Sequence, residues 1–127
     1  MKTIFLSISL VVCFAASGQN LDCAKFRTGS FTMQDPQTGI NYVSRNDSTQ
    51  VEYLPKFGVK VLLNAKWIDN CTLKLSLKEV LENPNNVPIQ EFILISEIIE
   101  TQKDFYIMKS KAIDMDLTMI RKFSIVN

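Results

Sequence analysis

Few side chains in this sequence combine the types and spacing that chemistry requires. Arg45 and Glu52 stand on either side of residues 46–48, where two antiparallel strands would bring them close together. A guanidinium at such a place can pair with the carboxylate across the strands, or it can bind a ligand carboxylate through two parallel hydrogen bonds. The ion pair is the more common arrangement near a turn, and it contributes little when it is exposed. We therefore expect Arg45 to pair with Glu52.

A second pair of acidic residues, Asp114 and Asp116, lies two positions apart. Paired carboxylates can perform acid–base catalysis or bind calcium, but no neighbouring residues have the spacing of a calcium loop. The sequence contains no histidine, which removes the commonest general base and the commonest zinc ligand. We expect a solvated acidic face at these positions, no catalytic residue, no metal and no cofactor.

The first 18 residues have the pattern of a secretory signal peptide. Lys2 is followed by an apolar run from residue 4 to 16 and then by the small residues Ala16-Ser17-Gly18. The run is shorter than the roughly 20 residues that a membrane-spanning helix needs. We expect residues 1–18 to be removed, residues 19–127 to form one domain without a membrane span, and the mature chain to be secreted or periplasmic.

Two of the three cysteines remain after this cleavage, Cys23 and Cys71. Disulfides persist in exported proteins, and two cysteines allow a single intramolecular pairing. A redox or nucleophilic role is disfavoured, because the sequence has neither a C-x-x-C motif nor a histidine that could act as base. We expect a structural disulfide between Cys23 and Cys71.

The charge of the chain excludes binding driven by bulk electrostatics. Fourteen basic residues stand against 13 acidic ones, for a formal net charge of +1. Nucleic acids and anionic membranes attract proteins with a basic surplus, which this sequence lacks. We expect no nucleic-acid partner.

The elements that would position these side chains are strands, because apolar and polar residues alternate along most of the mature chain. Residues 89–100 form a longer apolar run that could also be a helix, but their isoleucines favour a buried strand. Turn residues such as those of 35–39, 46–48 and 83–88 separate the runs. The expected strands are 26–34, 40–45, 49–54, 59–67, 72–80, 90–99, 105–111 and 113–123.

Short connections make each strand the antiparallel neighbour of the next. A meander of about eight strands hides its edges best by closing on itself, and such a barrel encloses either packed side chains or one small ligand. The sequence therefore predicts an all-β, up-and-down barrel, with a two-sheet sandwich as the alternative. Apolar residues at every second position of a strand share one face, which we expect to point inward. This predicts the residues that would line the interior: Val51, Tyr53, Leu63, Trp67, Met115 and Met119.

Three segments resemble a family of short exported bacterial proteins of undetermined function. They are the stretch from Cys23 to Phe31 (C-x-x-F-R-T-G-x-F), the stretch from Arg45 to Glu52 (R-x-x-x-x-Q-x-E) and the stretch from Trp67 to Cys71 (W-x-x-x-C). The resemblance covers most of the mature chain and implies a small lipocalin-like barrel. Some members carry the label DNA topoisomerase IV, but this chain is several times shorter than such an enzyme and has no nucleotide-binding glycine loop. The resemblance supplies no substrate and no catalytic residues.

Export and barrel size together favour a binding protein over an enzyme. We expect a small apolar or amphipathic molecule in the barrel, driven inside by burial of its apolar surface. The alternative is an interaction module with a side-chain-filled barrel that binds an envelope protein through a strand edge or the 83–88 loop. A ligand-sized cavity separates the first hypothesis from the second, for which an exposed apolar patch is expected instead.

Overall fold

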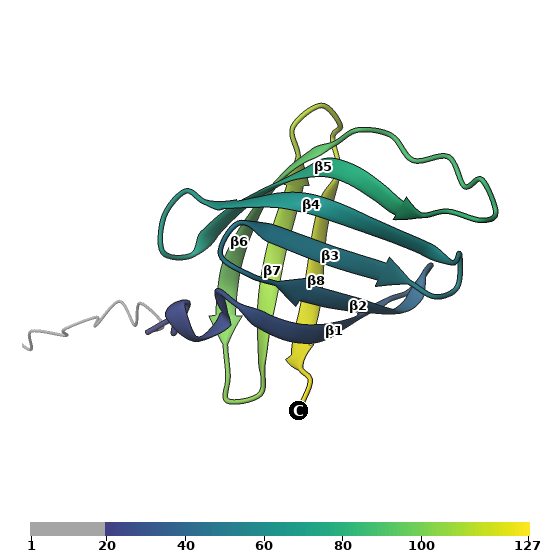
Figure 1. Ribbon diagram of the computed structural model, residues 1–127. Helices are drawn as coiled ribbons and strands as arrows, with labels where there is room; N and C mark the ends of the chain where they lie inside the picture. Colours follow the sequence, from purple (N-terminus) through teal and green to yellow (C-terminus); the bar gives the residue numbers. More distant parts are fainter. Residues whose placement is uncertain (1–19) are drawn as a thin grey trace, which may run out of the picture.

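The computed structural model describes residues 20–127, which form one closed antiparallel barrel (Figure 1). Each strand pairs with the next along the chain, and β1 pairs with β8 to close the barrel, with Phe31 opposite Ile125. The predicted up-and-down barrel is thereby confirmed, and the sandwich is not formed. The elements are η1 (Ala24–Phe26), β1 (Gly29–Asp35), β2 (Gly39–Arg45), β3 (Thr49–Leu54), β4 (Val59–Trp67), β5 (Thr72–Glu82), β6 (Ile93–Thr101), β7 (Phe105–Ala112) and β8 (Thr118–Ile125).

Short polar turns set the register of the first hairpins. The Asn46 side chain accepts hydrogen bonds from the backbone N–H groups of Ser48 and Thr49, at 3.0 and 2.8 Å, which fixes the predicted turn between β2 and β3. Gly39 and Gly58 have φ angles of +77° and +66°, which a residue without a Cβ atom adopts at little cost. These turns place Arg45 opposite Gln50 in the β2–β3 pair.

The segment that precedes β1, which includes η1, covers one end of the barrel. We call this end the capped end. Phe26 of η1 is fully buried against Tyr106, with ring centroids 5.0 Å apart. The predicted disulfide between Cys23 and Cys71 is formed, with Cα atoms 5.3 Å apart. It links the segment before η1 to the β4–β5 connection, which fixes the cap to the barrel wall.

The opposite, far end carries the β1–β2, β3–β4, β5–β6 and β7–β8 connections (Figure 1). β5 pairs with β6 only from Thr72 to Ser76, so the last part of β5 continues beside β4 alone. The β5–β6 connection then returns over this end, and its side chains Val87, Ile89 and Phe92 pack against the core. Contact between apolar side chains therefore holds this long connection in place.

Three predicted elements differ from the structure by three or more residues at their start. The first strand, predicted over 26–34, begins only at Gly29, and Phe26 belongs to η1. The run predicted as a strand over 90–99 is a strand, but it begins at Ile93 and ends at Thr101. The strand predicted over 113–123 begins only at Thr118, because residues 113–117 form the β7–β8 connection. Alternating polarity is therefore not sufficient to identify a strand where the chain reverses direction. The predicted signal peptide, residues 1–18, lies outside the described residues.

Candidate functional site

A buried arginine organises the interior beneath the cap. The Arg45 side chain is only 4% exposed. Its Nε donates to Gln50 Oε1 at 2.7 Å, and its two terminal nitrogens donate to the Phe26 carbonyl and to the Tyr106 hydroxyl, each at 2.8 Å. A buried charge is costly unless hydrogen bonds satisfy it, and three well-placed acceptors meet that demand here.

Aromatic rings surround the same guanidinium. Its central carbon lies 5.4 Å from the ring centroid of Phe31, 5.6 Å from that of Trp67 and 5.8 Å from that of Tyr106. Such ring faces attract a cation, most strongly when it is shielded from water. Arg45 is thus held as a cation by neutral acceptors and π-systems.

Glu52 is the carboxylate nearest to this arrangement in the hydrogen-bond network. Gln50 Nε2 donates to Glu52 Oε1 at 2.7 Å, and Gln50 Oε1 accepts from Arg45. The Gln50 side chain therefore connects Arg45 to Glu52 through two hydrogen bonds. Burial raises the pKa of Glu52, and the Gln50 hydrogen bond and the Arg45 charge oppose this rise only in part. Within residues 20–127, Gln50 is the only side chain that donates a hydrogen bond to this carboxylate.

A second acid–base pair lies in the same interior, on β1 and β8. Arg121 Nε donates to Asp35 Oδ2 at 2.8 Å. Burial alone would raise the pKa of Asp35, but backbone hydrogen bonds from Gln37 and Thr38 and the contact with Arg121 outweigh it and lower the pKa below its usual value. Asp35 and Arg121 therefore neutralise each other directly, unlike Arg45 and Glu52.

These four ionisable residues border one interior cavity of about 90 Å³. A pair of hydroxyls, Ser96 and Ser110, with oxygens 2.7 Å apart, lies on its β6–β7 side. The complete lining combines these polar groups with apolar side chains: Met33, Asp35, Arg45, Gln50, Glu52, Leu75, Leu94, Ser96, Met108, Ser110, Met119, Arg121 and Phe123. The cavity is therefore amphipathic, with charges and hydroxyls among leucine, methionine and phenylalanine.

The size of the cavity limits its occupant. A single water needs roughly 10–15 Å³ of such volume, and an engineered cavity of about 150 Å³ in another protein holds benzene. Drug-sized ligands occupy pockets of about 300–1,000 Å³. The space of about 90 Å³ admits several waters or one molecule of a few heavy atoms.

The β5–β6 connection is anchored by its own hydrogen bonds. Asn83 Nδ2 donates to the Val87 carbonyl at 2.8 Å, and the Val87 N–H donates back to Asn83 Oδ1 at 2.9 Å. Together with the apolar contacts of Val87, Ile89 and Phe92, this clamp holds the connection over the far end.

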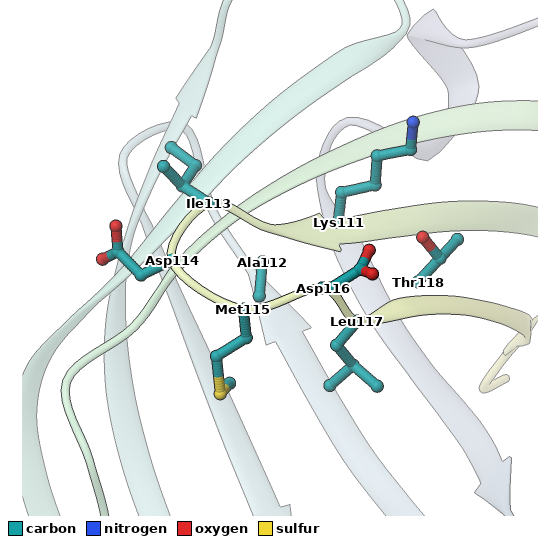
Figure 2. A pocket seen from close by; sticks show the side chains of 8 residues that line it. All are labelled: Lys111, Ala112, Ile113, Asp114, Met115, Asp116, Leu117 and Thr118. Carbon is teal, nitrogen blue, oxygen red and sulfur yellow. The ribbon is translucent and has the colours of Figure 1, made fainter.

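The β7–β8 connection exposes apolar side chains at the far end. Ile113, Met115 and Leu117 are 57%, 51% and 45% exposed. Figure 2 shows Met115 and Leu117 pointing to the same side of the connection, while Ile113 and Asp114 point away from them. The two acidic residues predicted to form a solvated face are exposed here, and the connection borders a shallow surface hollow over residues 111–118.

The residues predicted to line a pocket are not brought together. Met119 borders the cavity, whereas Leu63 is buried in the core and Trp67 packs at the capped end beneath the Arg27 guanidinium. Met115 lies in the exposed β7–β8 connection instead of a strand. The prediction was therefore wrong for Met115, and it placed Leu63 and Trp67 on the correct face but outside the cavity lining.

The prediction was also wrong for Val51 and Tyr53, because β3 is oriented the other way. Its inner face carries Gln50 and Glu52, so Val51 and Tyr53 point outward. Tyr53 stacks on Tyr42 of the outer surface, with ring centroids 6.3 Å apart. A polar interior reversed the usual rule that the apolar residues of a half-buried strand face inward.

The predicted ion pair between Arg45 and Glu52 is not formed either. Arg45 lies opposite Gln50 and Glu52 lies opposite Val43, so the two charges are out of register. Within the described part of the chain, the ion pairs are Lys60–Glu82 and Arg121–Asp35. The sequence held one signal that was missed. Arg45 lies two positions after Val43, so the two side chains point to the same face of the sheet. Residues opposite each other in an antiparallel pair also share a face, which places Gln50 inside the barrel with Arg45.

Comparisons of this chain with family models, with curated proteins and with solved structures found no significant match. The resemblance to short exported bacterial proteins therefore stays a prediction. Over residues 20–127, no helix has the length and apolar character needed to cross a membrane. In the same range, no cluster of three or more histidine, cysteine or acidic side chains is arranged to hold a metal ion.

Proposed function

We propose that this chain is an exported binding protein, and not an enzyme, that holds a small amphipathic molecule inside its barrel. The observation that carries the proposal is the cavity of about 90 Å³ whose wall combines ionisable, hydroxyl and apolar side chains. Pockets that bind small molecules are mostly apolar, with a few placed polar groups that fix orientation. The interior of this barrel has that composition on a small scale.

The energetic cost of the interior supports the same proposal. Buried charged groups are a weak source of stability, and well-packed apolar residues often replace them without loss. An eight-stranded barrel can be filled completely by apolar side chains. A barrel that instead keeps Arg45, Glu52, Asp35 and Arg121 around a space has a wall suited to contact with a polar guest.

Export is proposed on two grounds. The N-terminal residues have the pattern of a signal peptide, and the Cys23–Cys71 disulfide is a bond that persists in oxidising compartments. A secreted or periplasmic carrier would meet small polar metabolites outside the cytoplasm. The bond also holds the cap in place, which keeps the interior closed from that end.

The test is a small-fragment screen by saturation-transfer NMR with two matched variants. Ser110→Leu fills the cavity, whereas Ser44→Leu adds the same side chain to an exposed position of β2. We expect fragments to bind the natural chain and Ser44→Leu but not Ser110→Leu, with circular dichroism confirming that both variants fold. Equal binding to both variants, or no binding to the natural chain, would exclude the interior as a binding site.

A second candidate function rests on the exposed apolar residues of the β7–β8 connection. Contiguous exposed apolar side chains mark protein-interaction sites more often than scattered ones do. Met115 and Leu117 are both exposed and point to the same side of the connection at the far end (Figure 2). On this alternative the barrel is an interaction module for an envelope protein, and the interior network serves only the fold.

A photo-crosslinking amino acid at position 115 tests this alternative in the native host. The interaction module predicts one adduct of defined mass that disappears when Leu117 is replaced by serine. The matched control places the crosslinker at position 47, in the exposed β2–β3 turn at the capped end. Adducts that are equal at both positions would remove the support for an interaction site at the far end.

A further inference from the structure

We infer that the interior cavity selects electrically neutral molecules that both donate and accept a hydrogen bond, such as a primary amide. This inference deepens the proposed function and rests on it. Its basis is the balance of charge around the cavity and the set of hydrogen-bonding groups that remain free in its wall.

When Glu52 is ionised, the charges of the cavity wall cancel. Arg45 and Arg121 contribute two positive groups, and Asp35 and Glu52 contribute two negative ones. Inside a barrel the dielectric constant is low, so an uncompensated charge costs several kcal/mol. A charged guest would leave one net charge in this space, whereas a neutral guest leaves the balance intact.

The donors of the two arginines are engaged in part. Arg45 donates to Gln50, Phe26 and Tyr106, and Arg121 donates to Asp35 and to the Ile120 carbonyl at 2.9 Å. A guanidinium carries more N–H groups than these bonds use, so both arginines keep donors for a carbonyl oxygen of a guest.

The acceptor that remains is the Glu52 carboxylate. One of its oxygens receives the Gln50 hydrogen bond, and within the described part of the chain the other receives no side-chain donor. A carboxylate has room for about four hydrogen bonds, so it can accept an N–H or O–H group from a guest. This acceptor defines the donating half of the expected ligand.

A further donor is a serine hydroxyl. Ser96 and Ser110 share one hydrogen bond, in which only one of the two O–H groups is used. The hydrogen of the other hydroxyl is available to a carbonyl oxygen of a guest. An amide carries an N–H donor and a carbonyl acceptor on adjacent atoms, and its apolar remainder would lie against Leu94, Met108 and Met119.

The test uses three probes of nearly equal shape and different charge: acetate, acetamide and acetamidinium. Each is titrated at mildly alkaline pH, which favours the ionised form of Glu52. The readout is the methyl resonances of Met108 and Met119, which border the cavity. We expect acetamide to bind the natural chain at least about tenfold more tightly than either ion, a factor that corresponds to about 1.4 kcal/mol.

Two matched variants distinguish the effect of the cavity charge on ligand preference from the effect of the net charge of the protein. Glu52→Gln removes a negative charge from the cavity wall and should transfer the preference to acetate. Asp114→Asn removes a negative charge from the exposed β7–β8 connection and should leave the preference for acetamide unchanged. Both substitutions change the net charge by the same amount, so bulk attraction cannot explain a difference between them.

The outcomes distinguish the inference from the proposed function. An ion that binds the natural chain as tightly as acetamide, or an unchanged preference in Glu52→Gln, would overturn the inference. If none of the three probes binds while the fragment screen finds another interior ligand, the inference fails and the proposed function stands. If nothing binds in either experiment, both are wrong.

Discussion

Replacement of Arg45 by methionine should cost a large part of the stability of this barrel. The substitution preserves most of the side-chain length but removes three hydrogen bonds, to Gln50, Phe26 and Tyr106. Hydrogen bonds to charged groups contribute about 1.5–3 kcal/mol each, although they do not add fully within one network. The change also removes the Arg45 charge, which opposes the rise in the pKa of Glu52. Three hydrogen bonds that do not add fully, together with the buried acceptors left without a donor, predict a loss of about 3–5 kcal/mol.

Urea unfolding with the disulfide intact measures this loss, and two further variants interpret it. Arg45→Lys keeps the charge but cannot serve three acceptors with a planar group, so it should cost less than Arg45→Met. Arg45→Met combined with Glu52→Gln should recover part of the stability, because no orphaned charge remains. A loss below about 1 kcal/mol in Arg45→Met, or equal losses in the lysine and methionine variants, would refute the charge-network reasoning.

Three further predictions concern the disulfide, the buried acid and the exposed connection. Replacing Cys23 and Cys71 by alanine opens a link across 48 residues and should lower the free energy of unfolding by about 4 kcal/mol in urea melts; a loss below about 1 kcal/mol would contradict this. Because burial raises the pKa of Glu52, the folded state binds its proton more tightly than the unfolded chain does. The unfolding free energy of the natural chain relative to Glu52→Gln should therefore fall as pH rises above the usual glutamate range, and a rise would show that the shift has the opposite sign. Serine at Met115 and Leu117 should change stability by less than about 0.5 kcal/mol, and a larger loss in thermal melts would mean that these side chains are packed.

The fold was largely predictable because its physical determinants are local. Alternation of side chains along 59–67 and 72–77 matches the inner faces of β4 and β5, and the asparagine turn at 46–48 fixes the hairpin of β2 and β3. Short connections then leave few alternatives to a meander. The connection 113–117 was misassigned because it alternates in the same way as a strand, and nothing in its composition marks the reversal of the chain.

The candidate site was much less predictable, because its contacts join residues far apart in the sequence. Arg45 meets acceptors on residues 26 and 106, and Asp35 meets Arg121 across the closure of the barrel. The apolar face of β3 was assumed to point inward, whereas the arginine under the cap required polar partners on the inner face. Of the residues predicted to line the pocket, Met119 borders the cavity, while Arg45 and Glu52, which also border it, were expected to pair with each other near a turn.

The most direct measurement is a crystal structure of the protein soaked with acetamide. A neutral amide bound in the barrel should give density between the Glu52 carboxylate and the Ser96–Ser110 hydroxyls, with its methyl group toward the methionines. Acetamide found only on the outer surface, with side chains closing the interior space, would contradict a binding function for this barrel.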